Sequence, residues 1–233
     1  METSPENNPY AAPAAAITTR QVLPRLATRA RVARLSLLLL VPFLAVDVVI
    51  RILWLTGVSD FGQVGSASVK SLAWSVFSAA NGWLGVVAAL AFLIWFHYAY
   101  VRARSGVPYA RFTPGFAVVS WFIPLVNFVV PFLATRHLWQ LSRGGAEWRA
   151  EKIPGYILNW WCLWMLSHLV AFASLIAQAI AHWPRFGSVE GLSSPRFTLG
   201  IMLSSILSLC ALPLAMRLVR DVTSMQRERL GVD

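Results

Sequence analysis

The chain has 233 residues, of which 57% are hydrophobic and only 13% are charged, and its formal net charge at pH 7 is +10. A soluble domain of this length needs far more polar surface, so the composition excludes an ordinary soluble protein and indicates a protein of the lipid bilayer. The basic residues flank apolar stretches in short groups and form no stripe on one soluble face. The positive charge therefore does not indicate nucleic-acid binding.

The first 33 residues differ from the rest of the chain. They hold four prolines among small polar residues and become basic toward their end, while the first long apolar run begins only at Leu35. A cleaved signal peptide has its apolar core nearer the start, so we predict a disordered, basic, cytoplasmic tail over residues 1–33. Its last arginines, together with the one that follows it, are expected to attract anionic lipid headgroups. They are Arg25, Arg29, Arg31 and Arg34.

Four later stretches are each long enough to cross roughly 30 Å of hydrocarbon as a helix, which takes about 20 apolar residues. They are Leu35–Gly57, Leu72–Tyr100, Tyr156–His182 and Leu199–Met216. We therefore predict an all-α, polytopic membrane protein with four transmembrane helices. The helical transmembrane domain is expected over residues 34–220, followed by a cytoplasmic C-terminal tail over residues 221–233.

A fifth apolar stretch, Pro114–Thr135, is interrupted by Pro124 and Pro131, with Asn127 between them. Each proline removes a helix hydrogen bond, and its ring clashes with the preceding turn. If this stretch crosses the membrane, the basic residues divide almost evenly between the two sides. If it turns back, nearly all of them lie on one side, as the cytoplasmic excess of Lys and Arg requires. We predict a re-entrant or kinked segment and cytoplasmic termini, with five spans as the alternative.

The residues around these prolines also carry a family resemblance. The run "FTPGFAVVSWFIPLVNFVVPFLATRHLW" is followed by "NWWCLWMLS". The matching positions are Trp121, Pro124, Asn127, Pro131, Trp139, Trp160 and Trp161. This pattern resembles the uncharacterised bacterial membrane family catalogued as domain of unknown function 4328, over residues from about 70 to 220. The resemblance implies a multi-spanning protein of the bacterial cytoplasmic membrane and brings no known activity.

Ionisable residues at membrane depth are costly and are therefore candidate functional residues. Asp47 lies near the centre of the first predicted span, and Arg51 follows four residues later on the same helix face. This spacing predicts an ion pair within the helix, and an ion or proton path is the alternative. His168 lies near the centre of the third predicted span, either as a hydrogen-bonded packing residue or as a proton relay with Asp47.

Three amides complete the candidate intramembrane site: Asn81, Asn127 and Asn159. Such side chains usually form hydrogen bonds between helices, although broken helices like the one around Asn127 also hold substrate and ion contacts in transporters. In the second span, Gly82 lies four residues after a serine, and Gly85 lies four residues before an alanine. This small-residue spacing predicts a close helix approach, either within the chain or between two copies.

The sequence contains no phosphate loop, nucleophile elbow or zinc motif, so we expect neither a cofactor, a metal site nor an enzyme. The best-supported interpretation is a membrane scaffold or interaction protein whose basic tail and cytoplasmic loops bind lipids or partners, including a second copy of the chain. The alternative is a small-solute or ion transporter or channel that uses Asp47, Asn127 and His168.

Overall fold

The computed structural model describes residues 19–57, 69–105, 111–181 and 194–229, and these residues form helices without any strand. The long helices are α1 (Thr19–Leu55), α2 (Val69–Arg104), α5 (Gly155–Ala181) and α7 (Pro195–Glu228). The short elements are α3 (Pro114–Val119), η2 (Val126–Phe128), α4 (Val130–Gly144) and η3 (Gly145–Ala150). The all-α prediction is confirmed.

The four predicted spans are confirmed as well. Within the described residues, four helical stretches are long and apolar enough to cross a bilayer. They are Leu26–Leu55, Leu72–Arg104, Gly155–Ala181 and Pro195–Glu228. Most side chains in these stretches are not buried inside the protein, as expected for helices that face lipid. The chain is therefore a polytopic helical membrane protein.

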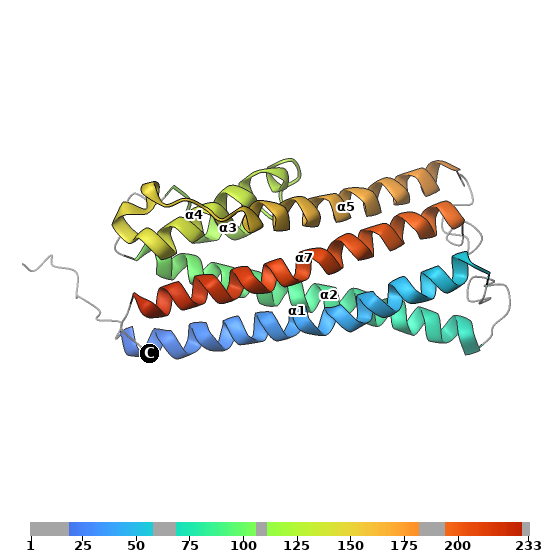
Figure 1. Cartoon of the computed structure of the whole chain (residues 1–233), viewed down its shortest axis with the longest axis horizontal. Coiled ribbons are helices and arrows are strands. Elements are labelled where there is room, and N and C mark those ends of the chain that lie inside the picture. Colours follow the sequence, from blue (N-terminus) through green and yellow to red (C-terminus); the bar gives the residue numbers. More distant parts are fainter. Residues whose placement is uncertain (1–18, 58–68, 106–110, 182–193, 230–233) are drawn as a thin grey trace, which may run out of the picture.

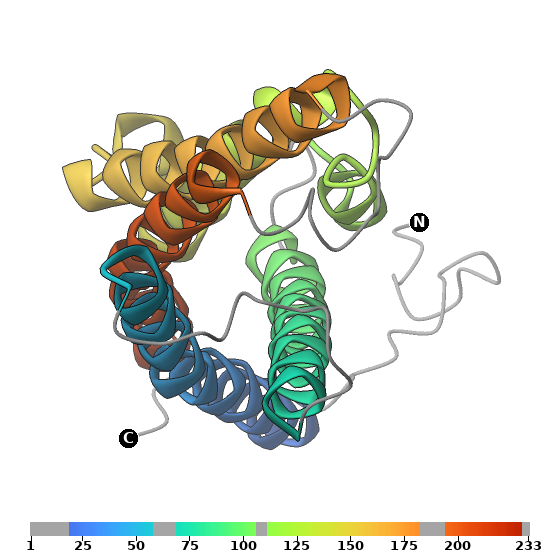
Figure 2. The same ribbon diagram turned by 90° about the vertical axis from the view of Figure 1, so that its right-hand side faces the viewer.

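The long helices run side by side along the length of the molecule (Figure 1). Helix α1 packs against α2 and α7, and α7 packs against α5. Seen from one end, the four helices form an open arc in the order α2, α1, α7, α5, so that α2 and α5 stand at its two tips (Figure 2). The start of α1, the end of α7 and all of α4 lie together at one end of the bundle, which we call the α4 end.

Helix α1 begins at Thr19, so the second half of the predicted tail, residues 19–33, is helical. Leu26, Ala30 and Ala33 recur among the arginines at helical spacing, and all three are buried. This apolar stripe packs against the bundle and stabilises the helix. Residues 1–18 lie outside the described residues. At the other terminus, α7 continues to Glu228, so the domain boundary placed after residue 220 falls inside a helix.

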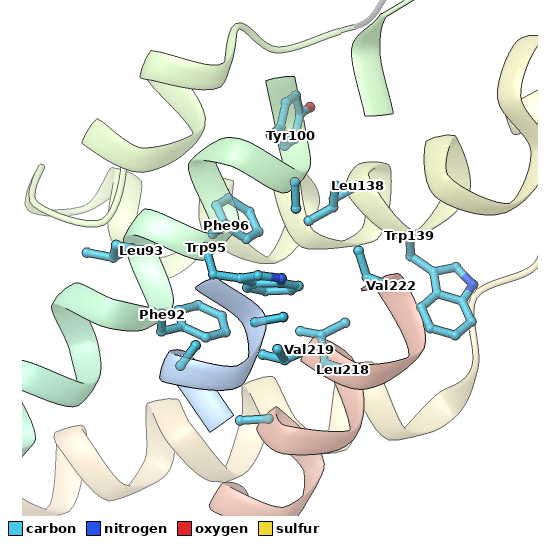
Figure 3. Packing of buried hydrophobic residues seen from close by; sticks show 14 of the residues in the cluster. Phe92, Leu93, Trp95, Phe96, Tyr100, Leu138, Trp139, Leu218, Val219 and Val222 are labelled. Carbon is cyan, nitrogen blue, oxygen red and sulfur yellow. The ribbon is translucent and has the colours of Figure 1, made fainter. Parts of the chain in front are cut away.

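The best-packed core lies at the α4 end (Figure 3). Its largest buried side chains come from α2, α4 and α7, and include Trp95, Phe96, Tyr100, Leu138, Leu141, Leu218, Val219 and Val222. Helix α1 has 37 residues, or about 55 Å at 1.5 Å per residue, whereas the hydrocarbon is roughly 30 Å thick. The helices are thus long enough to continue past the bilayer and to form, with α4, a compact body beside it.

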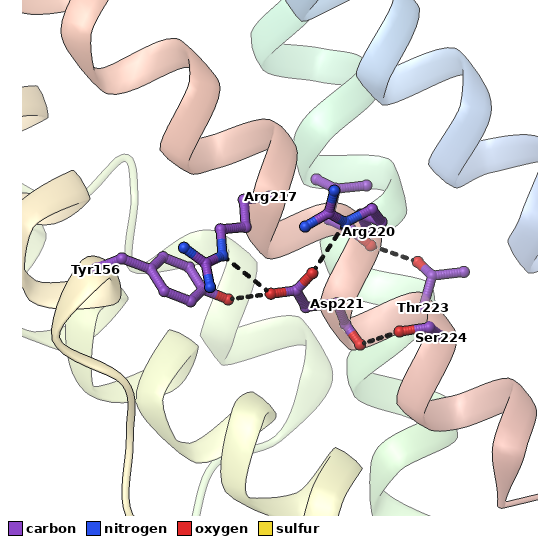
Figure 4. A network of polar contacts seen from close by, with 7 residues as sticks. Tyr156, Arg217, Arg220, Asp221, Thr223 and Ser224 are labelled. Atoms are coloured by element: carbon purple, nitrogen blue, oxygen red, sulfur yellow. Dashed lines mark hydrogen bonds and ion pairs between the residues drawn. The ribbon is translucent and has the colours of Figure 1, made fainter.

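Polar contacts join the helices at this end. The Tyr156 hydroxyl donates a hydrogen bond of 3.0 Å to the Asp221 carboxylate, which also pairs with Arg217 at 3.4 Å and Arg220 at 3.1 Å (Figure 4). The Gln226 amide nitrogen donates to the Ala99 carbonyl at 3.0 Å and to the Ser142 hydroxyl at 2.8 Å. These contacts fix α5 and α2 to α7 and explain polar residues that no motif accounts for.

Candidate functional site

The stretch with two prolines turns back on itself. Helix α3 ends at Val119 and α4 begins at Val130. In the reversal between them, the backbone N–H of Asn127 donates a hydrogen bond of 2.9 Å to the Ile123 carbonyl. Helices α3 and α4 have 6 and 15 residues, fewer than the roughly 20 needed to span. Both lie toward the α4 end (Figure 1), which favours the re-entrant interpretation over a kinked or fifth span.

The two prolines of this stretch occupy different structural positions. Pro124 lies in the reversal, directly before Leu125, whose φ of 67° is in the left-handed region. Pro131 is the second residue of α4, where its missing N–H breaks no helical hydrogen bond. The two prolines therefore end one short helix and start another.

The reversal places Trp121 among the aromatic side chains of α5 and α2. The centroid of its indole ring lies 5.3 Å from that of Trp164, 5.8 Å from that of Trp161 and 6.4 Å from that of Trp160. Phe92 of α2 completes the cluster at 5.8 Å from Trp121. Edge-to-face arrangements such as these are favourable for aromatic rings. Three of the tryptophans singled out in the sequence thus form one structural unit.

A cavity of about 390 Å³ lies against this aromatic cluster, inside the arc of long helices. All four long helices and Trp121 contribute to its wall. The lining residues are Leu37, Leu40, Leu44, Asn81, Gly82, Gly85, Ala88, Ala89, Phe92, Leu93, Trp121, Trp160, Trp164, His168, Ser208, Ala211, Leu212 and Ala215. Sites for small molecules typically occupy roughly 300–1,000 Å³, have mostly apolar walls and contain a few polar groups. This cavity is therefore the candidate functional site.

The cavity wall is polar at one end and aromatic at the other. Asn81, His168 and Ser208 lie on the parts of α2, α5 and α7 that are farther from the α4 end. Trp160 lies near the start of α5, at the opposite end of the cavity, and Trp121 lies against it with ring centroids 6.4 Å apart. The hydrogen-bonding side chains and the tryptophans Trp121 and Trp160, which we call the aromatic floor, thus lie at different ends of the cavity.

The two glycines of the second span widen the cavity. A Cβ atom added at Gly82 or Gly85 would meet no atom within 4 Å, so neither residue mediates the close helix contact expected within the chain. Gly82 and His168 are exposed although they line the cavity, which shows that the cavity opens to the surroundings. His168 lies near the middle of α5, a helix long and apolar enough to span a bilayer.

Asp47 and Arg51 form the predicted ion pair. The Arg51 Nε donates to the Asp47 carboxylate at 2.8 Å, and the Ser205 hydroxyl of α7 donates to the same carboxylate at 2.9 Å. The Arg51 guanidinium carbon also lies 5.5 Å from the centroid of the Trp74 ring. Asp47 is 4% exposed and does not line the cavity. It lies about one helical turn beyond the lining residues of α1, and its carboxylate is fully paired.

The remaining predicted residues separate into two groups. Asn81 and His168 share the cavity, whereas Asn127 and Asn159 are not among its lining residues. Asn127 is half-buried in η2 and its Oδ1 atom has no partner, while Asn159 is exposed on α5. Asp47, Asn127 and His168, proposed together for transport, therefore do not line one site. Sequence reasoning missed Trp164, although it lies four residues from both Trp160 and His168 on the same helix face.

The cavity and the cluster beside it contain groups that can form hydrogen bonds with a bound molecule. The His168 Nδ1 atom donates a hydrogen bond of 2.8 Å to the Trp164 carbonyl, so Nε2 is the ring nitrogen that can contact a ligand. The Asn81 Oδ1 and Trp121 Nε1 atoms are buried without a partner. Within the described ranges, no three side chains of His, Cys, Asp or Glu come close enough together to hold a metal ion.

The model of the family described as domain of unknown function (DUF4328) matches residues 61–224. The chain belongs to the DUF4328 family. No curated protein and no solved structure matches it. In this DUF4328 protein, Trp121, Trp160 and Trp161 form the aromatic cluster. Trp139 lies outside the cluster and packs on Tyr156, with their ring centroids 5.9 Å apart.

This DUF4328 protein also has a buried, hydrogen-bonded pair of a tyrosine and a histidine at the α4 end, apart from the cavity. The Tyr100 hydroxyl and the His137 Nδ1 atom form a hydrogen bond, and the His137 ring lies edge-on to Trp148 with centroids 4.5 Å apart. Burial, together with the positive charges of Arg111 and Arg104, lowers the pKa of His137 from 6.5 to about 4. His137 is therefore neutral at physiological pH, and its role is structural.

Proposed function

We propose that this DUF4328 protein is a membrane-embedded binding protein that takes up a lipid-derived molecule from the bilayer. The cavity inside the arc of helices carries this proposal. It is of small-molecule size, its wall is mainly aliphatic and aromatic, and its opening lies at the depth of the hydrocarbon. A lipid chain can reach such an opening directly, whereas a water-soluble solute cannot.

Ion transport is supported less well. A transport path needs polar or ionisable groups that line a continuous hydrated route. Asp47 is paired with Arg51 and Ser205, and it lies outside the cavity, as does Asn127. The scaffold role inferred from the sequence stays a prediction, and it is compatible with lipid binding because the body at the α4 end offers a separate surface.

We further propose that the α4 end faces the cytoplasm of a bacterial cell. Arg31 and Arg34 are exposed at this end, while the Arg29 guanidinium carbon lies 3.2 Å from the centroid of the Tyr98 ring. Exposed arginines next to a bilayer attract anionic headgroups. The side chain of Arg25 lies outside the described residues. A cysteine placed at Arg143 should react with a membrane-impermeant reagent only from the cytoplasmic side, and labelling from outside would overturn this orientation.

Filling the cavity tests lipid binding. A Gly85→Phe side chain would project into open space in the cavity without a clash near the backbone, so the helix should form normally. Val86→Phe is the matched control, because Val86 is the next residue of α2, is 48% exposed and does not line the cavity. Native mass spectrometry of protein purified in a mild detergent would measure the retained lipid.

We expect the wild type and Val86→Phe to retain one lipid molecule, and Gly85→Phe to lose occupancy by about tenfold, which corresponds to about 1.4 kcal/mol. Circular dichroism and gel filtration would show that both variants are folded. Equal lipid retention by Gly85→Phe and Val86→Phe, or a wild type without bound lipid, would contradict the proposed function.

A further inference from the structure

The two ends of the cavity differ in chemistry, and this difference identifies a class of ligand. We propose that the cavity holds an uncharged, single-chain lipid with a hydroxyl group, of the monoacylglycerol or long-chain alcohol class. Its hydroxyl lies between Asn81 and His168, and its chain ends against Trp121 and Trp160. This inference rests on the proposed lipid binding and adds the headgroup chemistry and the orientation of the ligand.

The dimensions of the cavity favour one chain. On α2 the lining residues extend from Asn81 to Leu93, about 18 Å at 1.5 Å per residue, and on α1 from Leu37 to Leu44, about 10 Å. A volume of about 390 Å³ lies near the lower limit for small-molecule sites, roughly 300 Å³. A long and narrow space of this volume fits one extended chain and is too small for a two-chain phospholipid.

The polar end favours a headgroup that donates a hydrogen bond. The Asn81 Oδ1 atom is a buried acceptor without a protein partner. Because Nδ1 of His168 is directed to the Trp164 carbonyl, Nε2 is the ring nitrogen that can contact a ligand, and a hydroxyl group can pair with it as donor or acceptor. A hydroxyl group satisfies the Asn81 acceptor and can in turn accept a hydrogen bond. An alkane or a methyl ester would leave the buried Asn81 Oδ1 atom unpaired, which is unfavourable.

The cavity does not favour an ionised headgroup. Its lining contains no Lys, Arg, Asp or Glu. Arg34 lies on α1 three residues before Leu37, at the aromatic end. The first cation beyond Leu44, at the polar end, is Arg51, whose charge is offset by Asp47. A carboxylate or ammonium group would thus enter a weakly polar site without a counter-charge, which is strongly unfavourable. The free fatty acid anion and the single-chain amine are therefore expected to bind poorly.

The aromatic end favours the apolar end of the ligand. The rings of Trp121, Trp160 and Phe92 lie with their centroids within 6.4 Å of one another and close the cavity toward the α4 end. Large aromatic surfaces stabilise an alkyl chain by burying it and by dispersion contacts. The chain terminus is expected at these rings, with the hydroxyl closer to the opposite end of the bundle.

Two photoreactive monoacylglycerols would test this orientation in the full-length protein in lipid nanodiscs. One carries a diazirine at the end of the acyl chain and the other carries it beside the glycerol group, and mass spectrometry maps the labelled peptides. We expect the chain-end reagent to label the peptides with Trp121 and Trp160, and the glycerol-end reagent to label those with Asn81 and His168. The reverse pattern would overturn this inference but leave the proposed lipid binding intact.

Binding measurements on variants test the headgroup. Asn81→Leu should lower the affinity for monoacylglycerol by about tenfold and leave the affinity for the corresponding alkane unchanged, because only the hydrogen bond is lost. Asn159→Leu is the matched control, since Asn159 is exposed on α5 and does not line the cavity. Unchanged affinity of Asn81→Leu, or tighter binding of the fatty acid anion, would overturn the headgroup assignment. If both reagents label only residues outside the cavity, the proposed function itself fails.

Discussion

At the scale of single residues, His137 shows how the body at the α4 end depends on pH. Its pKa in the folded protein is about 4, whereas an unfolded histidine titrates near 6.5. Above about pH 6.5 the ring is neutral in both the folded and the unfolded state, and His137 does not reduce the free energy of unfolding. Between about pH 6.5 and about pH 4 only the unfolded chain binds the proton, so the free energy of unfolding decreases as the pH falls.

We therefore predict that acidification from about pH 7.5 to about pH 5 lowers the melting temperature, through a loss of about 2 kcal/mol from this residue. His137→Gln should lose much less stability over the same pH interval, because glutamine does not titrate. His97→Gln, a half-buried position on α2, should keep the acid sensitivity of the wild type. An unchanged pH dependence in His137→Gln would show that another group is responsible.

Residue-level prediction from sequence succeeded where the partners share a helix. The pair of Asp47 and Arg51 followed from their spacing alone, since residues four apart lie on one helix face. Ser205, which also binds Asp47, is 158 residues away and belongs to a different helix. Its role depends on the rotation of α7 against α1, which the sequence pattern does not define. The same reason kept Asn81 and His168 from being recognised as members of one cavity.

At the scale of elements, α5 and α7 approach each other closely at Gly200. A Cβ atom at this position would lie 1.9 Å from the Ser174 hydroxyl oxygen and 2.8 Å from the Ser174 Cβ. We predict that Gly200→Ala destabilises the protein by about 1–3 kcal/mol through overpacking. Adding Ser174→Gly should restore most of the loss, because it removes both close atoms. Thermal unfolding followed by tryptophan fluorescence would measure these changes.

Gly85→Ala is the matched control for this experiment, because its Cβ would meet no atom within 4 Å. It should be neutral or slightly stabilising, since alanine favours helices over glycine. Equal destabilisation by Gly85→Ala and Gly200→Ala would mean that the glycines act through the backbone and not through helix contacts. The sequence pattern had placed the close approach at Gly82 and Gly85, because it detects small residues but not the partner that faces them.

Other elements were predictable to different degrees. The four spans followed from length and hydrophobicity, and the reversal from its prolines and the charge distribution. The helical start of α1 at Thr19 was not predicted, because its arginines and prolines resemble a flexible tail. There, tertiary packing of Leu26, Ala30 and Ala33 outweighs the local composition.

At the scale of the whole molecule, the two ends of the bundle differ in how closely their helices pack. The body at the α4 end is closely packed and joined by polar contacts, whereas the arc opens between α2 and α5 within the membrane. The reversal of the chain around Pro124 connects the two parts, because its residue Trp121 lines the cavity and packs against Trp164. Trp121, Trp160 and Trp161, three of the residues on which the sequence resemblance was based, thus lie where the body meets the cavity.

The most direct test of this account is an experimental structure of the full-length protein in lipid nanodiscs. We predict that α2 and α5 stand apart and that one elongated density lies between them, extending from Asn81 and His168 to Trp121. The same structure of Gly85→Phe should lack this density and keep the arrangement of the helices. A wild-type structure in which α2 packs directly against α5 and closes the cavity would contradict the account.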